Sequence, residues 1–250
     1  MVFLDDILIY SPTLESHLQH LKSVLDTLRQ HQFYLKASKC TFAQQQPQYL
    51  GHIISKEGVA TDPKKTEAMC QWPSPSNVTE LRGFLGLTGY YRKFVKHYGI
   101  IARPLTHLLK KKQFSWSEEA QVAFEKLKVA MVNTPVLALP NFSEPFTLET
   151  DACDSGVGAV LMQNNRPIAF FSKSLAASHQ HLSIYEKEFL ALMMAIEKWR
   201  QYLQQNEFII QTDHKSLTYL GDQQLQSEMQ KKAMARLMGL QFKIVYKPGK

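Results

Sequence analysis

The order of hydrophobic patterns in the second half of the chain constrains its fold more than any other feature. Three short apolar or alternating runs, at residues 146–151, 159–162 and 168–171, are separated by turn-forming residues and predict strands joined as hairpins. A long amphipathic pattern over residues 183–203 predicts a helix, and residues 208–213 predict another strand. This order is typical of an α+β or mixed α/β domain in which helices flank a mixed β-sheet.

Carboxylates stand at matching places in this pattern. Asp151 and Asp213 each follow a threonine at the end of a predicted strand, which places them at the rim of the sheet. On a helix with about 100° per residue, Glu188 falls within the apolar stripe, whereas Glu186 and Lys187 fall on the face expected to meet water. An acid on an apolar face is unfavourable unless it has a partner. Asp residues that share a divalent cation with it would provide one, and oxygen ligands suit Mg²⁺.

The first half of the chain begins with an apolar run, residues 2–10, that contains the adjacent carboxylates Asp5 and Asp6. Leucines at three- and four-residue spacing predict an amphipathic helix over residues 14–28. Residues 48–54 predict a strand, and residues 56–58 predict a hairpin turn after it.

A break at residues 72–76, rich in proline and serine, separates two units of this pattern. After it, Asn77 can cap a helix with Glu80 three residues later. A further helix is predicted at residues 118–131, and the prolines that follow it mark a plausible boundary.

Residues 81–117 are strongly basic and contain no Asp or Glu. The cations alternate with Tyr90, Tyr91, Phe94 and Tyr98, a composition typical of a surface that lies along a phosphate backbone. The alternative is that the aromatic rings belong to the core and the cations are merely solvated. The basic residues of this segment are Arg82, Arg92, Lys93, Lys96, Arg103, Lys110, Lys111 and Lys112.

The overall charge of +7 and the pI near 9.2 suit a chain with a polyanionic partner, although a merely basic protein would look the same. The three cysteines, Cys40, Cys70 and Cys153, are far apart and indicate neither a disulfide framework nor a zinc site. No apolar run is long enough to span a membrane, and the first residues are not a signal peptide. The sequence therefore predicts an intracellular protein without a membrane partner.

Three stretches of the second half resemble the ribonuclease H domain of gypsy-type LTR retrotransposon Pol polyproteins. They are TDA at residues 150–152, YEKEFLA at 185–191 and TDHKSL at 212–217. In the first half, FLDD at residues 3–6 resembles the polymerase motif of that family, and YLGH at 49–52 resembles the hairpin that holds the primer terminus. The stretch LRGFLGLTGYYRKF at residues 81–94 resembles the region after the palm, so the motifs follow the family's order along the chain.

The resemblance implies a fragment truncated at both ends. Residues 1–72 would be the C-terminal part of a reverse transcriptase palm, residues 73–140 a thumb or connection-like helical region, and residues 141–250 a ribonuclease H-like domain lacking its C-terminal end. Asp5 and Asp6 would be a remnant of the polymerase site, whose third Asp comes from an earlier strand. We therefore expect RNA-directed DNA polymerase activity only in the full-length parent. The helix that carries a fourth metal-binding Asp in this family would likewise follow the last strand.

By the same resemblance, Asp151, Glu188 and Asp213 would hold Mg²⁺, as two ions and with Mn²⁺ as an alternative, and would cut the RNA strand of RNA/DNA hybrids. The basic segment would track the duplex, and its partner would be a hybrid or a template-primer duplex. The remaining Pol segments or a second copy of the chain could complete the assembly, in the cytoplasm, a virus-like particle or the nucleus. The alternative is a catalytically inactive, nucleic-acid-binding remnant of a retrotransposon.

Overall fold

The computed structural model describes residues 1–110, 114–176, 179, 181–215, 217 and 237–248. The chain divides into two compact units, Met1–Lys56 and Glu57–Lys250. Within the described residues, no helix is both long and apolar enough to cross a membrane.

The first unit contains two short hairpins and one long helix. Its elements are β1 (Val2–Phe3), β2 (Asp6–Ile7), α1 (Leu14–Gln30), the 3-10 helix η1 (Ala37–Lys39), β3 (Gln48–Tyr49) and β4 (His52–Ser55). The predicted leucine helix is confirmed as α1, whose first turn is capped by the side chain of Thr13. Although α1 is amphipathic, none of its residues is buried.

The prediction of one strand over residues 48–54 was wrong. Leu50 and Gly51 take positive φ angles of 48° and 71°, so the chain reverses there and β3 pairs antiparallel with β4. Glycine adopts this conformation without strain, which makes Gly51 the residue that favours the turn. The hairpin suggested by the YLGH motif is therefore present.

The second unit begins with β5 and a group of helices. These elements are β5 (Gly58–Thr61), α2 (Pro63–Cys70), α3 (Val78–Tyr90), the 3-10 helix η2 (Arg92–Phe94), α4 (Tyr98–Ile101), α5 (Arg103–Leu108) and α6 (Glu118–Val132). The cap at Asn77 is confirmed, because its side chain accepts a hydrogen bond of 2.9 Å from the N–H of Glu80. The helix predicted at residues 118–131 is confirmed as α6.

The helices enclose a hydrophobic core that contains most of the aromatic rings of the basic segment. Tyr91 and Phe94 are each 1% exposed and Tyr98 is 8% exposed, whereas Tyr90 remains 53% exposed. Three of the four rings therefore pack inside, and the expectation that all four line a nucleic-acid surface was wrong.

A five-stranded mixed sheet follows, in the order β10-β9-β6-β7-β8. Its strands are β6 (Thr147–Cys153), β7 (Gly156–Gln163), β8 (Arg166–Ser174), β9 (Phe208–Thr212) and β10 (Phe242–Tyr246). The first three form the predicted antiparallel hairpins, and β9 and β10 add in parallel to the other side of β6. The turn between β6 and β7 is only Asp154 and Ser155, shorter than the predicted turn over residues 154–158.

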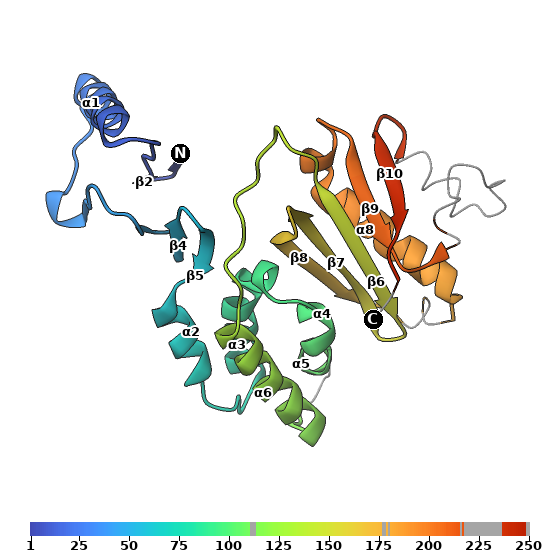
Figure 1. The fold of residues 1–250 in the computed structure, drawn as a ribbon. Coiled ribbons are helices and arrows are strands. Elements are labelled where there is room, and N and C mark those ends of the chain that lie inside the picture. The colour runs from blue at the N-terminus through green and yellow to red at the C-terminus, as the bar shows by residue number, and fades with distance from the viewer. Residues whose placement is uncertain (111–113, 177–178, 180, 216, 218–236, 249–250) are drawn as a thin grey trace. The chain divides into compact units, whose positions relative to one another are not determined.

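The predicted long helix is confirmed as α8 (Ile184–Leu203), which packs against β6 and β7 (Figure 1). Ser183 caps it and exchanges hydrogen bonds with Glu186, so that the first turn is fixed. The structure thus has the expected mixed α/β architecture, with helices on a mixed sheet.

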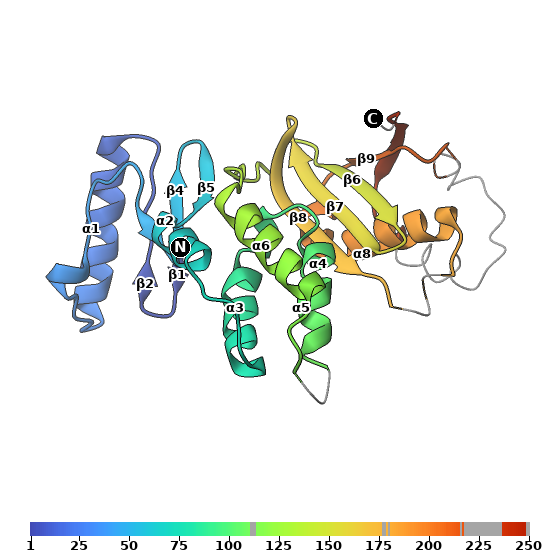
Figure 2. The same ribbon diagram turned by 90° about the horizontal axis from the view of Figure 1, so that it is seen from below.

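The helical group contacts the sheet at β7 and β8 through η2 and α4 (Figure 2). The N–H of Gly99 donates a 2.7 Å hydrogen bond to Oγ of Ser172, and Arg92 donates a 3.3 Å bond to the carbonyl of the same serine. In register, Ser172 pairs with Gly158, which in turn pairs with Asp151. Directly paired residues of antiparallel strands share a face. The helical group therefore covers the same face of the sheet as the side chain of Asp151.

Candidate active site

Glu188 combines deep burial with a carboxylate oxygen that has no hydrogen-bond partner among the described residues. It lies in the second turn of α8, where it is only 4% exposed. Its Oε1 accepts a 2.9 Å hydrogen bond from the N–H of Ala152 in β6. Its Oε2 is buried and has no hydrogen-bond partner among the described residues. One oxygen of this carboxylate is therefore held in place, and the other is available for a ligand.

The surroundings of Glu188 disfavour its charged form. Burial is the largest cause and raises its pKa to about 7, against an ordinary value of 4.5. The hydrogen bond from Ala152 lowers the pKa, and the negative charges of Asp213 and Asp151 raise it further. The charges of both aspartates thus act on the Glu188 carboxylate, an effect that a bound cation would relieve.

Both aspartates lie at the same end of neighbouring strands. Asp151 is an exposed residue of β6, and Asp213 is exposed directly after the last residue of β9. Since β6 and β9 run parallel, their carboxyl ends meet at one edge of the sheet. Within the described residues, however, no three His, Cys, Asp or Glu side chains are gathered closely enough to form a metal site.

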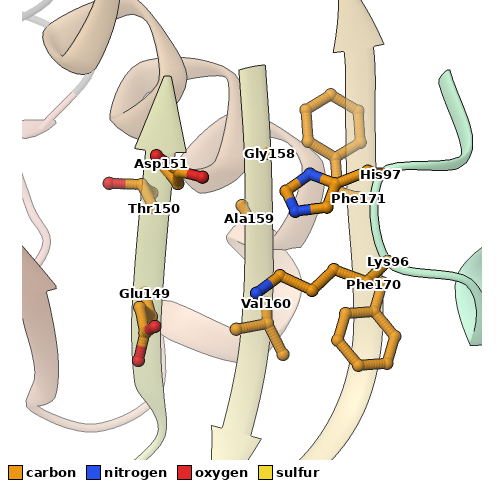
Figure 3. Close-up of a pocket in the computed structure, with 10 residues that line it drawn as sticks. All are labelled: Lys96, His97, Glu149, Thr150, Asp151, Gly158, Ala159, Val160, Phe170 and Phe171. Carbon is orange, nitrogen blue, oxygen red and sulfur yellow. The ribbon is translucent and has the colours of Figure 1, made fainter. Parts of the chain in front are cut away.

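A small pocket adjoins Asp151 on the face of the sheet that carries the helical group. Figure 3 shows Lys96 and His97 reaching over β7 from one side, while Glu149 and Asp151 stand on β6 at the other. The pocket thus sets two basic side chains opposite two carboxylates. Glu149 is also engaged by Lys247, at 2.6 Å.

His97 was not singled out by the sequence. It has a left-handed backbone, with φ at 60°, and packs so closely on Gly158 that a Cβ there would lie 3.2 Å from its Nδ1. Burial lowers the pKa of His97, the charge of Lys96 lowers it further, and Asp151 opposes both. The sequence could not show that His97 lies beside Asp151, because the residues that His97 contacts on the sheet are some sixty positions away in the chain.

The basic residues of the predicted nucleic-acid surface differ in their exposure and in their contacts. Arg92 is engaged with Ser172, and its guanidinium lies 5.9 Å from the centre of the Tyr98 ring. Lys93 lies over the Phe94 ring, and the partial desolvation of its exposed side chain there lowers its pKa. Arg103 is half-buried. The exposed cations are Arg82, Arg92, Lys93, Lys96 and Lys110, whereas Lys111 and Lys112 lie outside the described residues.

Asp5 and Asp6 lie in the first unit, in the hairpin of β1 and β2. Phe3 pairs with Asp6, which leaves Leu4 and Asp5 as the turn. Both carboxylates are exposed, and the backbone carbonyl of Asp6 accepts a 3.5 Å hydrogen bond from the Tyr49 hydroxyl. Asp5 therefore lies in the turn of this hairpin, and Asp6 is the first residue of its second strand.

Two family models match the sequence. Residues 1–54 match the reverse transcriptase (RNA-dependent DNA polymerase) model, and residues 116–210 match the RNase H-like domain found in reverse transcriptase. The second match includes Asp151 and Glu188 and ends before Asp213.

Curated relatives match along the whole chain. The sequence is 39% identical, over 100% of its length, to the retrovirus-related Pol polyprotein from transposon 297 of Drosophila melanogaster, of which it covers 24%. It is 35% identical, again over 100%, to the corresponding polyprotein from transposon gypsy of the same fly, of which it covers 25%. The chain thus spans about a quarter of the length of these relatives.

The fold is similar to that of a solved reverse transcriptase. The foamy viral protease-reverse transcriptase in complex with an RNA/DNA hybrid superposes with a TM-score of 0.84 at 18% identity. The similarity covers 95% of this chain and 34% of the viral one.

Proposed function

The chain belongs to the retrovirus-related Pol polyproteins of retrotransposons, as part of their reverse transcriptase and RNase H-like region, and on that premise we propose that it hydrolyses the RNA strand of RNA/DNA hybrids with the help of a divalent metal. The observation that carries the proposal is the Glu188 carboxylate. It is buried, held at one oxygen and unpartnered at the other, and lies near the charges of Asp151 and Asp213.

The donor set fits a hard cation. Carboxylate oxygens are the ligands that Mg²⁺ prefers, and Mn²⁺ accepts the same oxygens. The metal, as one or two ions, would be held by Glu188, Asp151 and Asp213. When bound, it would supply the activation of a water and the stabilisation of the leaving oxygen. For its part, the chain fixes Glu188 through Ala152 and presents the two aspartates at the edge where β6 and β9 end.

The proposed substrate is a nucleic-acid duplex. The exposed cations Arg82, Lys96 and Lys110 would contact its phosphates, which would make binding weaken as salt concentration rises. In this assignment, residues 1–72 are a palm segment, residues 73–140 a thumb or connection-like region and residues 141–250 the nuclease domain. The proposed cleavage would take place inside the cell, where RNA/DNA hybrids form.

The deciding experiment is incubation of the purified chain with a labelled RNA/DNA hybrid, with and without Mg²⁺. Mg²⁺-dependent cutting is expected, and Glu188→Gln should abolish it because the neutral amide no longer offers a charged ligand oxygen. Glu186→Gln is the matched control, two residues away on the same helix, where the carboxylate caps Ser183 instead. Equal loss of cutting in both variants would contradict the assignment of Glu188.

A second candidate function is hybrid binding without catalysis. It is favoured by the finding that the described side chains form no ready cluster of three metal ligands. In that case the chain would bind the hybrid equally well with Mg²⁺ or with a chelator and would leave the RNA intact, and Glu188→Gln would change neither result.

A further inference from the structure

An ion pair between a buried lysine and an exposed aspartate joins α8 to the turn between β6 and β7. Nζ of Lys187 lies 2.7 Å from Oδ1 of Asp154. The lysine side chain is only 7% exposed, whereas the aspartate side chain is 96% exposed. Lysine is rarely buried to this extent unless its charge is paired, so the aspartate is the group that allows Lys187 to occupy an interior position.

This pair lies directly beside the hydrogen bond that holds the candidate metal ligand. Lys187 precedes Glu188 on the helix, and Asp154 comes two residues after Ala152, in the turn that follows β6. The same two segments are therefore joined twice, by Ala152 N–H to Glu188 Oε1 at 2.9 Å and by Lys187 to Asp154 at 2.7 Å.

The two segments differ in how firmly they are fixed by other contacts. The start of α8 is held by the reciprocal hydrogen bonds of Ser183 and Glu186. The turn has only two residues. Leu175 N–H donates to the Ser155 carbonyl, which links the turn towards β8, and Ser155 Oγ lies 3.0 Å from Sγ of Cys153 at the end of β6. Lys187 and Asp154 thus provide a side-chain link from the tip of the turn to α8.

We propose that Lys187 and Asp154 are positioning residues of the nuclease site. Their ion pair holds the end of β6 against α8, which keeps the Ala152 N–H on Glu188 Oε1 and thereby directs Oε2 towards the metal. Neither residue touches the substrate. The inference rests on the proposed function for its catalytic consequence, but its structural part stands independently of it.

The test compares Lys187→Met with the wild type. Methionine fills the buried site without a charge and removes the link to Asp154. Two measurements are made: the hydrogen-exchange rate of the Ala152 amide in the absence of metal, and kcat and KM for Mg²⁺-dependent cleavage of a labelled hybrid. We expect faster exchange at Ala152 and a roughly tenfold lower kcat with an unchanged KM, as for other residues that orient metal ligands.

The matched control is Lys243→Met, which removes an ion pair of the same length, 2.7 Å, between Lys243 and Glu207 on the β9 and β10 side of the sheet. It should change neither measurement. Asp154→Asn serves as the second variant, because its side chain is almost fully exposed and contributes little packing of its own. Asp154→Asn should show the same faster exchange and lower kcat. It therefore tests the proposal even if Lys187→Met does not fold.

The outcomes separate the two proposals. Wild-type chain that does not cut would overturn the proposed function, while faster Ala152 exchange in the variants would still support the positioning role. Unchanged exchange and unchanged kcat in Lys187→Met or Asp154→Asn would overturn the positioning role even if the wild type is an active nuclease.

Discussion

At the scale of single residues, the raised pKa of Glu188 makes stability depend on pH. The unfolded carboxyl ionises near 4.5, whereas burial keeps the folded one protonated until about pH 7. The stability that goes with the protonated form is therefore complete below pH 4.5 and is lost as the pH rises towards 7. The loss is up to about 3 kcal/mol, because each pKa unit corresponds to about 1.4 kcal/mol.

We predict that Glu188→Gln, whose side chain cannot ionise, removes this part of the pH dependence. In urea unfolding with a chelator present, the variant should gain stability relative to the wild type between pH 5 and pH 8. Glu186→Gln should not, because the Ser183 hydrogen bonds lower the pKa of Glu186 instead. A wild type and a Glu188→Gln variant with parallel pH profiles would show that the pKa of Glu188 is not raised in the folded chain.

Glu188 and its neighbour show what the sequence can and cannot predict about a residue. The burial of Glu188 followed from helical periodicity, since its stripe is continuous with that of Phe189 and Leu192. Periodicity also placed Lys187 on the water-facing side, which was wrong, because this lysine is buried. A helical wheel describes one helix alone. It does not show that the β6–β7 turn brings Asp154 over the lysine.

At the scale of elements, close backbone contacts fix α4 on β8. A Cβ built on Gly99 would lie 2.7 Å from the carbonyl oxygen of Ser172, an approach that real Cβ atoms do not make. The glycine thus lets the helix come near enough for its N–H to bind Ser172 Oγ. Only a glycine allows this contact without a shift of one of the two backbones.

We predict that Gly99→Ala destabilises the chain by about 1–3 kcal/mol, the usual cost of overpacking a tight contact. Gly86→Ala is the control, because a Cβ on this exposed residue of α3 meets nothing within 4 Å. It should stabilise by about 0.5–1 kcal/mol, since alanine favours a helix more than glycine does. Denaturant unfolding would measure both changes, and equal effects would contradict the close packing of α4 on the sheet.

The sequence predicted the long elements better than the short ones. α1, α6 and α8 were found from periodicity because several turns repeat the pattern. The β3–β4 hairpin was read as one strand, because a two-residue turn interrupts the apolar run without a proline or a polar cluster. Aromatic and basic residues alternate in the same way on a core helix and on a nucleic-acid surface, so only packing showed that Tyr91, Phe94 and Tyr98 are buried.

At the scale of the whole molecule, the buried core is distributed unevenly between the two units. The three clusters of buried apolar residues in the described part of the chain consist of residues from Glu57–Lys250. In Met1–Lys56, by contrast, α1 buries none of its residues, and side chains such as Leu14, Leu18 and Tyr34 remain largely exposed. Because apolar burial supplies most of the stability of a fold, nearly all of it should come from the second unit.

We predict that residues 57–250 alone unfold cooperatively with a midpoint within about 3 °C of the full chain, roughly the shift that 1 kcal/mol produces in a domain of this size. Residues 1–56 alone should show no cooperative transition, because they have no comparable apolar cluster within the described structure. Calorimetry on the three proteins would test this. A large loss of midpoint on removing residues 1–56 would mean that the first unit stabilises the second in solution. The hairpin with Asp5 and Asp6 would then belong to the same folding unit as the five-stranded sheet.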